Sequence, residues 1–212
     1  MTLAGLIAAG AVAAASANGS EPRVLVGAWP EETVSAWAEH AQAAGLEGAA
    51  RDAACIQVAK ALLQCLVVEE QGKRRLGTAA DQKRFGGRAA LLAAGRVAAK
   101  EALEGFEETE LPDLPGRSFY VRSRGDGLDT AVVADPGKVH ARFGGATVMA
   151  FPDAGTTLVW RRGDPEMDKI LAVAVHKAWL AAERPVSPRV YRWDGDGLIE
   201  WAVARPTEAG SP

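Results

Sequence analysis

The spacing of the hydrophobic residues changes near residue 117. In the first half, Ala and other apolar residues recur every three or four positions, which is the period of an α-helix. In the second half, apolar and polar residues alternate in short runs, which is the period of a β-strand. The pattern therefore predicts an α+β protein, with an Ala-rich helical N-terminal half followed by an antiparallel sheet.

The first half is predicted to begin with one short strand and then to continue as helices. The strand candidate is the apolar run Arg23–Trp29, and Pro30 followed by two glutamates is typical of a helix start. Gly86 and Gly87 should kink or split the last helix, because paired glycines are unfavourable in a helix interior. The expected helices span residues 31–45, 49–70 and 79–103, with a loop between the last two.

Both cysteines, Cys55 and Cys65, fall within the predicted helix 49–70. In an α-helix their Cα atoms would be about 15 Å apart, whereas a disulfide requires less than about 7 Å. We therefore expect two free thiols, as is typical of buried cysteines in a reducing compartment.

The second half is predicted to form three hairpins and two helices. Helix-start signals occur at Asp135-Pro136 and Asp164-Pro165, where Asp can cap the helix and Pro can occupy its first turn. The resulting order, ββ-α-ββ-α-ββ, favours an antiparallel sheet with both helices on one face. The expected strand pairs are 118–123 with 128–134, 146–151 with 156–161, and 189–193 with 198–203; the expected helices run from 136 to Gly144 and over 165–182.

Several segments of the second half carry a resemblance to a known family. They are DTAVVADPGKVHARFGG, TVMAFPDAGTTLVW, the helix that follows, and RPVSPRVYRWDGDGL. From Gly116 onward the chain resembles the C-terminal half of the YtpQ-like family of uncharacterised bacterial proteins. The resemblance covers under half of the chain, implies a bacterial protein with the fold of that C-terminal half, and supplies no catalytic residues.

Composition divides the chain into five parts. The acidic residues 101–113 and the prolines and glycine after them indicate a linker between the two halves. The expected parts are an apolar N-terminal segment 1–20, an Ala-rich helical region 21–110, a linker 111–117, an α+β domain 118–204 and a tail 205–212.

Residues 1–20 are uncharged and rich in Ala and Gly. Ala15-Ser16-Ala17 fits the small-residue cleavage site of an export signal, but no Lys or Arg precedes the apolar run. That run is also shorter than the ~20 residues of a membrane span. We therefore expect a cytoplasmic protein that does not bind a membrane, and export through an atypical N-terminal signal segment is the alternative.

Charged residues are grouped along the chain, although the formal net charge is only −3. Residues 73–100 contain eight basic residues and one acidic residue, whereas residues 101–113 contain six acidic residues and no basic one. Opposite charges neutralise each other within about one Debye length, ~8–10 Å, so we expect the two blocks to pair. The alternative is a surface for an anionic partner or a nucleic-acid backbone. The candidate interaction surface consists of Lys73, Arg74, Arg75, Lys83, Arg84 and Arg88.

The sequence contains no pattern typical of catalysis, of a cofactor site or of a metal site. Its three histidines lie on different predicted helices, without a second His or Cys one turn away. Asp194-Gly195-Asp196-Gly197 fits a hairpin turn better than a calcium loop, because the glutamate that completes such a loop is missing. The carboxylates of Asp164, Glu166 and Asp168 are explained by their place at a helix start.

We therefore expect a non-catalytic protein-interaction module, without a cofactor, that docks a protein partner or another copy of itself. Two alternatives stay open. One is a hydrolase with a site of scattered carboxylates, and the other is an electrostatic nucleic-acid binder that uses residues 73–100.

Overall fold

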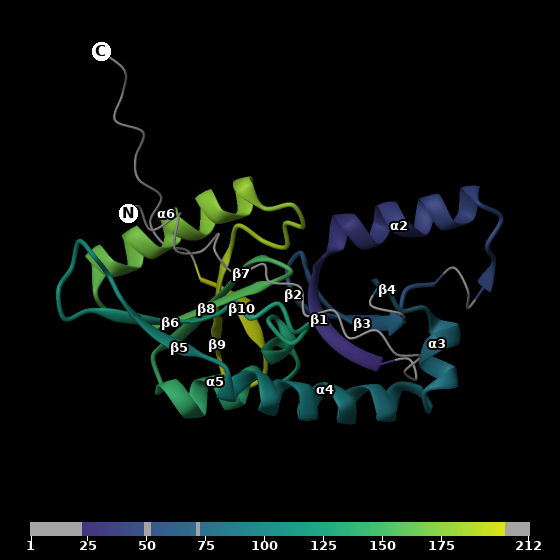
Figure 1. Cartoon of the computed structure of the whole chain (residues 1–212), viewed down its shortest axis with the longest axis horizontal. Coiled ribbons are helices and arrows are strands. Elements are labelled where there is room, and N and C mark those ends of the chain that lie inside the picture. Colours follow the sequence, from purple (N-terminus) through teal and green to yellow (C-terminus); the bar gives the residue numbers. More distant parts are fainter. Residues whose placement is uncertain (1–22, 49–51, 71–72, 202–212) are drawn as a thin grey trace, which may run out of the picture.

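The computed structural model describes residues 23–48, 52–70 and 73–201, which form two antiparallel sheets with helices around them (Figure 1). The expected α+β class is confirmed. In chain order the elements are β1 (Arg23–Pro30), α2 (Glu31–Ala43), β2 (Cys55–Ala59), β3 (Leu62–Glu70), β4 (Lys73–Leu76), α3 (Ala79–Arg84), α4 (Gly87–Glu104), β5 (Glu107–Glu110), β6 (Ser118–Arg122), the 3-10 helix η2 (Ala131–Ala134), α5 (Pro136–Phe143), β7 (Thr147–Asp153), β8 (Thr156–Arg161), α6 (Pro165–Ala181), β9 (Val190–Trp193) and β10 (Leu198–Glu200).

The first sheet is built around β3, which pairs on both sides. β1 runs antiparallel along all of it, from Arg23 opposite Glu69 to Pro30 opposite Leu62. On the other side, β2 pairs with the first half of β3 and β4 pairs with the second half. Residues of β3 are buried on both faces of the sheet, so the strand is an almost continuous apolar run.

The prediction of a helix over residues 49–70 is wrong, because residues 55–70 form the hairpin β2–β3. The apolar spacing of this segment also fits a helix, since a strand buried on both faces shows no alternation. The turn lies at Ala61, whose φ of 58° is left-handed. The prediction of two free thiols is therefore also wrong: Cys55 and Cys65 form a disulfide across the hairpin.

The second sheet has the strand order β10-β9-β7-β8-β6-β5. Two expected hairpins are confirmed within the described residues, β7–β8 and β9–β10. The expected hairpin of 118–123 with 128–134 is wrong: β6 instead pairs with β5 and β8, and residues 131–134 form η2. Both sides of β6 are already paired, so the segment after it cannot form a hairpin with β6, and η2 packs against α4 and β1. Strand β5 lies in the acidic block 101–113, which therefore is not wholly a linker.

The helices of the second half lie on opposite faces of the sheet, so the prediction that both cover one face is wrong (Figure 1). Successive residues of β7 point to opposite sides. Val148 packs with Leu171 of α6, whereas Met149 packs with Val139 and Phe143 of α5. Element order alone does not determine which face a connecting helix covers.

Helix α4 connects the two sheets (Figure 1). Its buried residues pack into an apolar core to which both sheets contribute. The expected split at Gly86-Gly87 is confirmed, since α3 ends at Arg84 and α4 begins at Gly87. Small residues let α4 lie close to its neighbours: a Cβ on Gly95 would come within 3.1 Å of the Ala134 Cβ. Its buried residues include Ala98 and Ala102, which are four positions apart and therefore lie on the same face of the helix.

The apolar segment 1–20 and the tail 205–212 lie outside the described residues, as do the last residues of the expected strand 198–203. The expected helical region 21–110 is wrong where it covers residues 55–76, which form β2, β3 and β4. The boundary of the α+β domain at 118 stays a prediction.

Candidate functional site

The six basic residues predicted as an interaction surface are all exposed, but they belong to two groups. Three lie in β4, at the edge of the first sheet, and three lie around the turn from α3 to α4. The β4 group is Lys73, Arg74 and Arg75; the group at the helix turn is Lys83, Arg84 and Arg88.

Two arginines of β4 are engaged within the protein. The Arg74 Nε lies 2.8 Å from Glu69 Oε2, and its Nη2 donates to the carbonyl oxygen of Gly125 at 3.3 Å. Arg75 donates two hydrogen bonds to Asp81, at 2.6 and 2.9 Å. These contacts connect β4 to a neighbouring strand, to the loop after β6 and to α3.

Asp81 also caps α3. Its carboxylate accepts the Thr78 backbone N–H at 2.8 Å, and the Thr78 hydroxyl in turn accepts the Asp81 backbone N–H at 3.2 Å. This reciprocal pair is a capping box. The hydrogen bonds from Arg75 and then from Thr78 hold the pKa of the Asp81 carboxyl far below its usual range. Arg75 and Asp81 therefore stabilise the helix start and are not free to bind a partner.

The cations at the helix turn are less engaged. Arg84 lies 3.6 Å from Glu70, and its guanidinium carbon lies 5.3 Å from the centroid of the Phe85 ring. Within the described ranges, Lys83 and Arg88 form no ion pair. These two side chains therefore keep their charge available at the surface.

The expected pairing of the basic block 73–100 with the acidic block 101–113 is wrong for the residues that the structure places. The basic side chains pair instead with Glu69, Glu70 and Asp81. In the acidic block, Glu107 lies 3.8 Å from Arg124, and Glu110 accepts the backbone N–H of Gly116 at 2.5 Å. The blocks are adjacent in sequence, but the long helix α4 leads away from the basic turn to the acidic strand β5.

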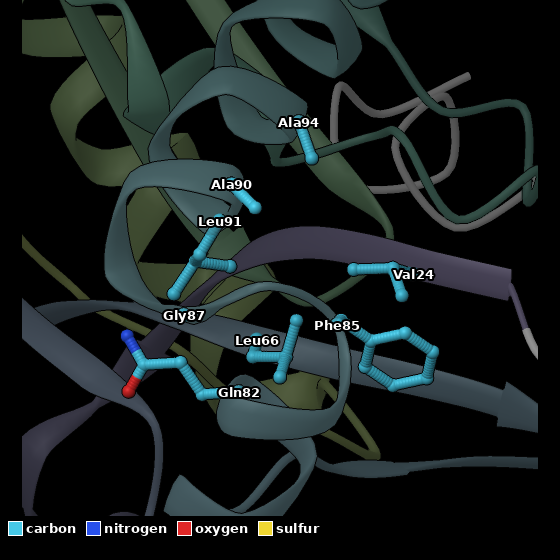
Figure 2. Close-up of a pocket in the computed structure, with 8 residues that line it drawn as sticks. All are labelled: Val24, Leu66, Gln82, Phe85, Gly87, Ala90, Leu91 and Ala94. Atoms are coloured by element: carbon cyan, nitrogen blue, oxygen red, sulfur yellow. The ribbon is translucent and has the colours of Figure 1, made fainter.

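A pocket of about 150 Å³ opens beside the helix turn (Figure 2). Its floor comes from the first sheet and its walls from α3, the turn and α4. Gly86 and Gly87 both have left-handed φ, 96° and 79°, which lets the chain reverse sharply at this point. The lining residues are Val24, Leu66, Gln82, Phe85, Gly87, Ala90, Leu91 and Ala94.

The pocket lining is apolar except for the Gln82 amide, and it contains no titratable side chain. Such a site can bury an apolar group but offers no acid, base or nucleophile. The sequence analysis identified the cations beside the pocket but missed the pocket itself. Val24 and Leu66 are brought next to α4 by strand pairing, and the only sequence signal was the Gly86-Gly87 break between two helices.

The most buried charges outside this pocket hold a loop in place. The Arg122 side chain is 2% exposed, and its Nη2 donates to Asp126 at 2.5 Å. Asp129, also buried, accepts the backbone N–H groups of Arg124 and Gly125 at 2.7 and 3.0 Å. Burial raises the pKa of the Asp129 carboxyl. These contacts fix the loop after β6 and do not form an open site.

The last hairpin turn and the cap of α6 have their expected contacts, whereas Asp135 precedes α5 without a capping hydrogen bond from its side chain. Asp194 accepts backbone N–H groups of Asp196 and Gly197 in the last hairpin turn. Asp164 caps α6, and Asp168 accepts the Trp160 indole N–H at 2.9 Å. Across residues 23–48, 52–70 and 73–201, no group of three His, Cys, Asp or Glu side chains could hold a metal ion.

None of the described helices is long and apolar enough to span a bilayer. The chain was also compared with known proteins. No family model matches it, and neither a curated protein nor a solved structure does.

Proposed function

We propose that this chain is a protein-interaction module that buries an apolar side chain of a protein partner in the pocket between the first sheet and the α3–α4 turn. The observation that carries the proposal is the pocket itself: apolar, open at the surface and about 150 Å³ in volume. The adjacent cations Lys83, Arg84 and Arg88 supply a polar border.

The pocket volume favours a side chain over a small-molecule ligand. Sites for drug-sized ligands usually span about 300–1,000 Å³ and combine an apolar lining with several polar groups. This pocket is smaller and has one polar lining side chain, Gln82. Protein interfaces, by contrast, often depend on a few anchor side chains that fill pockets of this kind.

Neither alternative has comparable support. A hydrolase needs a base or nucleophile beside a cavity, and the lining of this pocket provides neither. A nucleic-acid binder needs many free cations on one surface, whereas Arg74 and Arg75 are engaged in contacts within the protein. The likeness to the YtpQ-like family stays an expectation about the fold from Gly116 onward.

The disulfide changes the expected compartment. Structural disulfides persist mainly in oxidising compartments, and they are rare in the cytosol of mesophiles. We therefore infer that the protein works outside the cytoplasm, which was the alternative in the sequence analysis.

Peptide selection with the full chain tests the proposed function. A display library of random linear peptides is selected on the wild-type protein, and the selected peptides are measured against two variants. Ala94→Leu fills the pocket, whereas Ala93→Leu makes the same change at the neighbouring exposed position of α4. Circular dichroism and thermal melts check that both variants are folded.

We expect the Ala94→Leu variant to bind the peptides at least about tenfold more weakly, because a hot-spot anchor contributes about 2 kcal/mol or more and a tenfold change requires about 1.4 kcal/mol. The Ala93→Leu variant should bind as the wild type does. Equal binding by all three proteins, or the absence of any selected peptide, would show that the pocket is not a docking site.

A further inference from the structure

The pocket has an uneven charge environment. Three cationic residues are each adjacent in sequence to a residue that lines it: Lys83 follows Gln82, Arg84 precedes Phe85 and Arg88 follows Gly87. By the same measure Asp81 precedes Gln82, but its carboxylate is paired with Arg75. The described structure places one carboxylate in an ion pair with the three cations, that of Glu70 at 3.6 Å from Arg84. The border of the pocket is therefore positively charged.

From this we propose that the partner segment is acidic: one apolar side chain enters the pocket, and carboxylates beside it bind Arg84 and Arg88. This inference rests on the proposed function and adds the chemistry of the partner. Guanidinium groups bind carboxylates through two parallel hydrogen bonds, which gives direction as well as charge. Complementary charge also speeds association and excludes partners of the wrong sign.

Arg84 is placed for this role before a partner arrives. Its side chain is 59% exposed, and its guanidinium lies over the ring of Phe85, which lines the pocket. A cation stacked on an aromatic ring loses less conformational freedom when it binds a carboxylate. The ion pair with Glu70 is exposed on both sides, and exposed pairs are weak, so a partner carboxylate can replace Glu70 at low cost.

Arg88 completes the border on the other helix. It is exposed, it directly follows Gly87 at the start of α4, and no ion pair within the described residues uses it. The apolar wall of Leu91 lies one helical turn further along α4. A segment that places an apolar side chain in the pocket would therefore lie beside Phe85 and Gly87, the lining residues that are adjacent in sequence to Arg84 and Arg88.

The experiment uses the peptides from the selection on the full chain. Their composition is determined, and their affinities are measured for wild type, Arg84→Glu, Arg88→Glu and Arg96→Glu at low and at physiological salt. Arg96 is the matched control, because it is an exposed arginine of α4, as Arg88 is, but neither of its sequence neighbours lines the pocket. Anionic phospholipid vesicles and duplex DNA are tested beside the peptides.

The expected peptides contain Asp or Glu near a single Leu, Met or Phe. We expect their binding to weaken about tenfold or more in Arg84→Glu and Arg88→Glu, to stay unchanged in Arg96→Glu, and to fall as salt rises. Pocket-dependent peptides that are neutral or basic would overturn this inference and leave the proposed function standing. Selection of no pocket-dependent peptide, or tighter binding to the vesicles or the DNA, would overturn both.

Discussion

Cys55 and Cys65 lie directly opposite each other on the neighbouring antiparallel strands β2 and β3, with their Cα atoms 4.1 Å apart, and their sulfur atoms form a disulfide. The bond joins the edge strand β2 to the central strand of the first sheet. Cys65 is fully buried, and the next residue, Leu66, lines the pocket. The crosslink therefore holds the strand that forms the pocket floor.

Unfolded but unreduced protein should contain no titratable thiol, and reduced protein should contain two. The double variant Cys55→Ala/Cys65→Ala should lose about 2–3 kcal/mol of unfolding free energy, because the crosslink restricts the unfolded chain. Urea unfolding of the oxidised protein, the reduced protein and the variant measures this loss. Two thiols in the unreduced protein, or equal stability of all three forms, would contradict the observed disulfide.

How much of the fold can be derived from the sequence depends on whether local signals agree with the tertiary environment. Asp164 before Pro165 predicted α6, because its side chain caps the neighbouring backbone N–H groups. Asp135-Pro136 predicted α5 through Pro136 in the first turn, since Asp135 makes no capping hydrogen bond with its side chain. Gly86-Gly87 correctly predicted the helix break. These features require no knowledge of distant residues.

The wrong predictions concern a strand that is buried on both faces and therefore lacks the alternation of apolar and polar residues. Strand β3 packs Leu66 on one face and Val67 on the other, so its sequence shows no alternation and reads equally as a helix. The wrong prediction of two free thiols followed directly from the wrong prediction of a helix over residues 49–70.

For the candidate site, the cations could be found from the sequence, but the pocket could not. Its floor is formed by β1 and β3, which strand pairing places beside α4.

Loss of the Asp81 carboxylate should destabilise the protein in a pH-dependent way. Hydrogen bonds from Arg75 hold the pKa of this carboxyl below that of the unfolded chain, which is about 4. The contribution of the ionised Asp81 carboxylate to the free energy of unfolding is therefore fully present above about pH 4. It is lost as the pH falls towards the folded-state pKa. We expect Asp81→Asn to lose about 1–2 kcal/mol at neutral pH, mainly through the cap, and the difference from wild type to shrink below about pH 4.

Urea unfolding over a series of pH values measures this difference. Asp113→Asn is the control, because Asp113 is exposed and its carboxylate, within the described structure, neither pairs with an arginine nor caps a helix. A constant difference between Asp81→Asn and wild type from neutral pH down to pH 3 would show that the ionised carboxylate is not responsible.

Gly105 should not tolerate a side chain. A Cβ at this position would lie 1.4 Å from Nη1 of Arg122, whose side chain is buried and paired with Asp126. To make room, the guanidinium would have to leave its partner in the protein interior. We expect Gly105→Ala to lose about 2 kcal/mol or more of unfolding free energy. Gly197→Ala is the matched control, since its Cβ would meet no atom within 4 Å; equal thermal stability of the two variants would contradict the observed packing.

Duplex DNA is expected to bind weakly even at low salt. Of the six candidate cations, Arg74 and Arg75 are engaged with carboxylates of the same chain, which leaves about four to meet phosphates, including Arg84 with its weak, exposed pair to Glu70. Since each neutralised phosphate contributes about −0.9 to the slope of log K against log salt, the slope should be no steeper than about −4. Fluorescence anisotropy with a labelled duplex at several salt concentrations measures it. The double variant Lys83→Glu/Arg88→Glu should lower the slope by about two, because it removes two of those four cations. A wild-type slope of about −6 with nanomolar affinity at low salt would instead favour a nucleic-acid binder, because it would require that the paired arginines leave their carboxylates for the DNA.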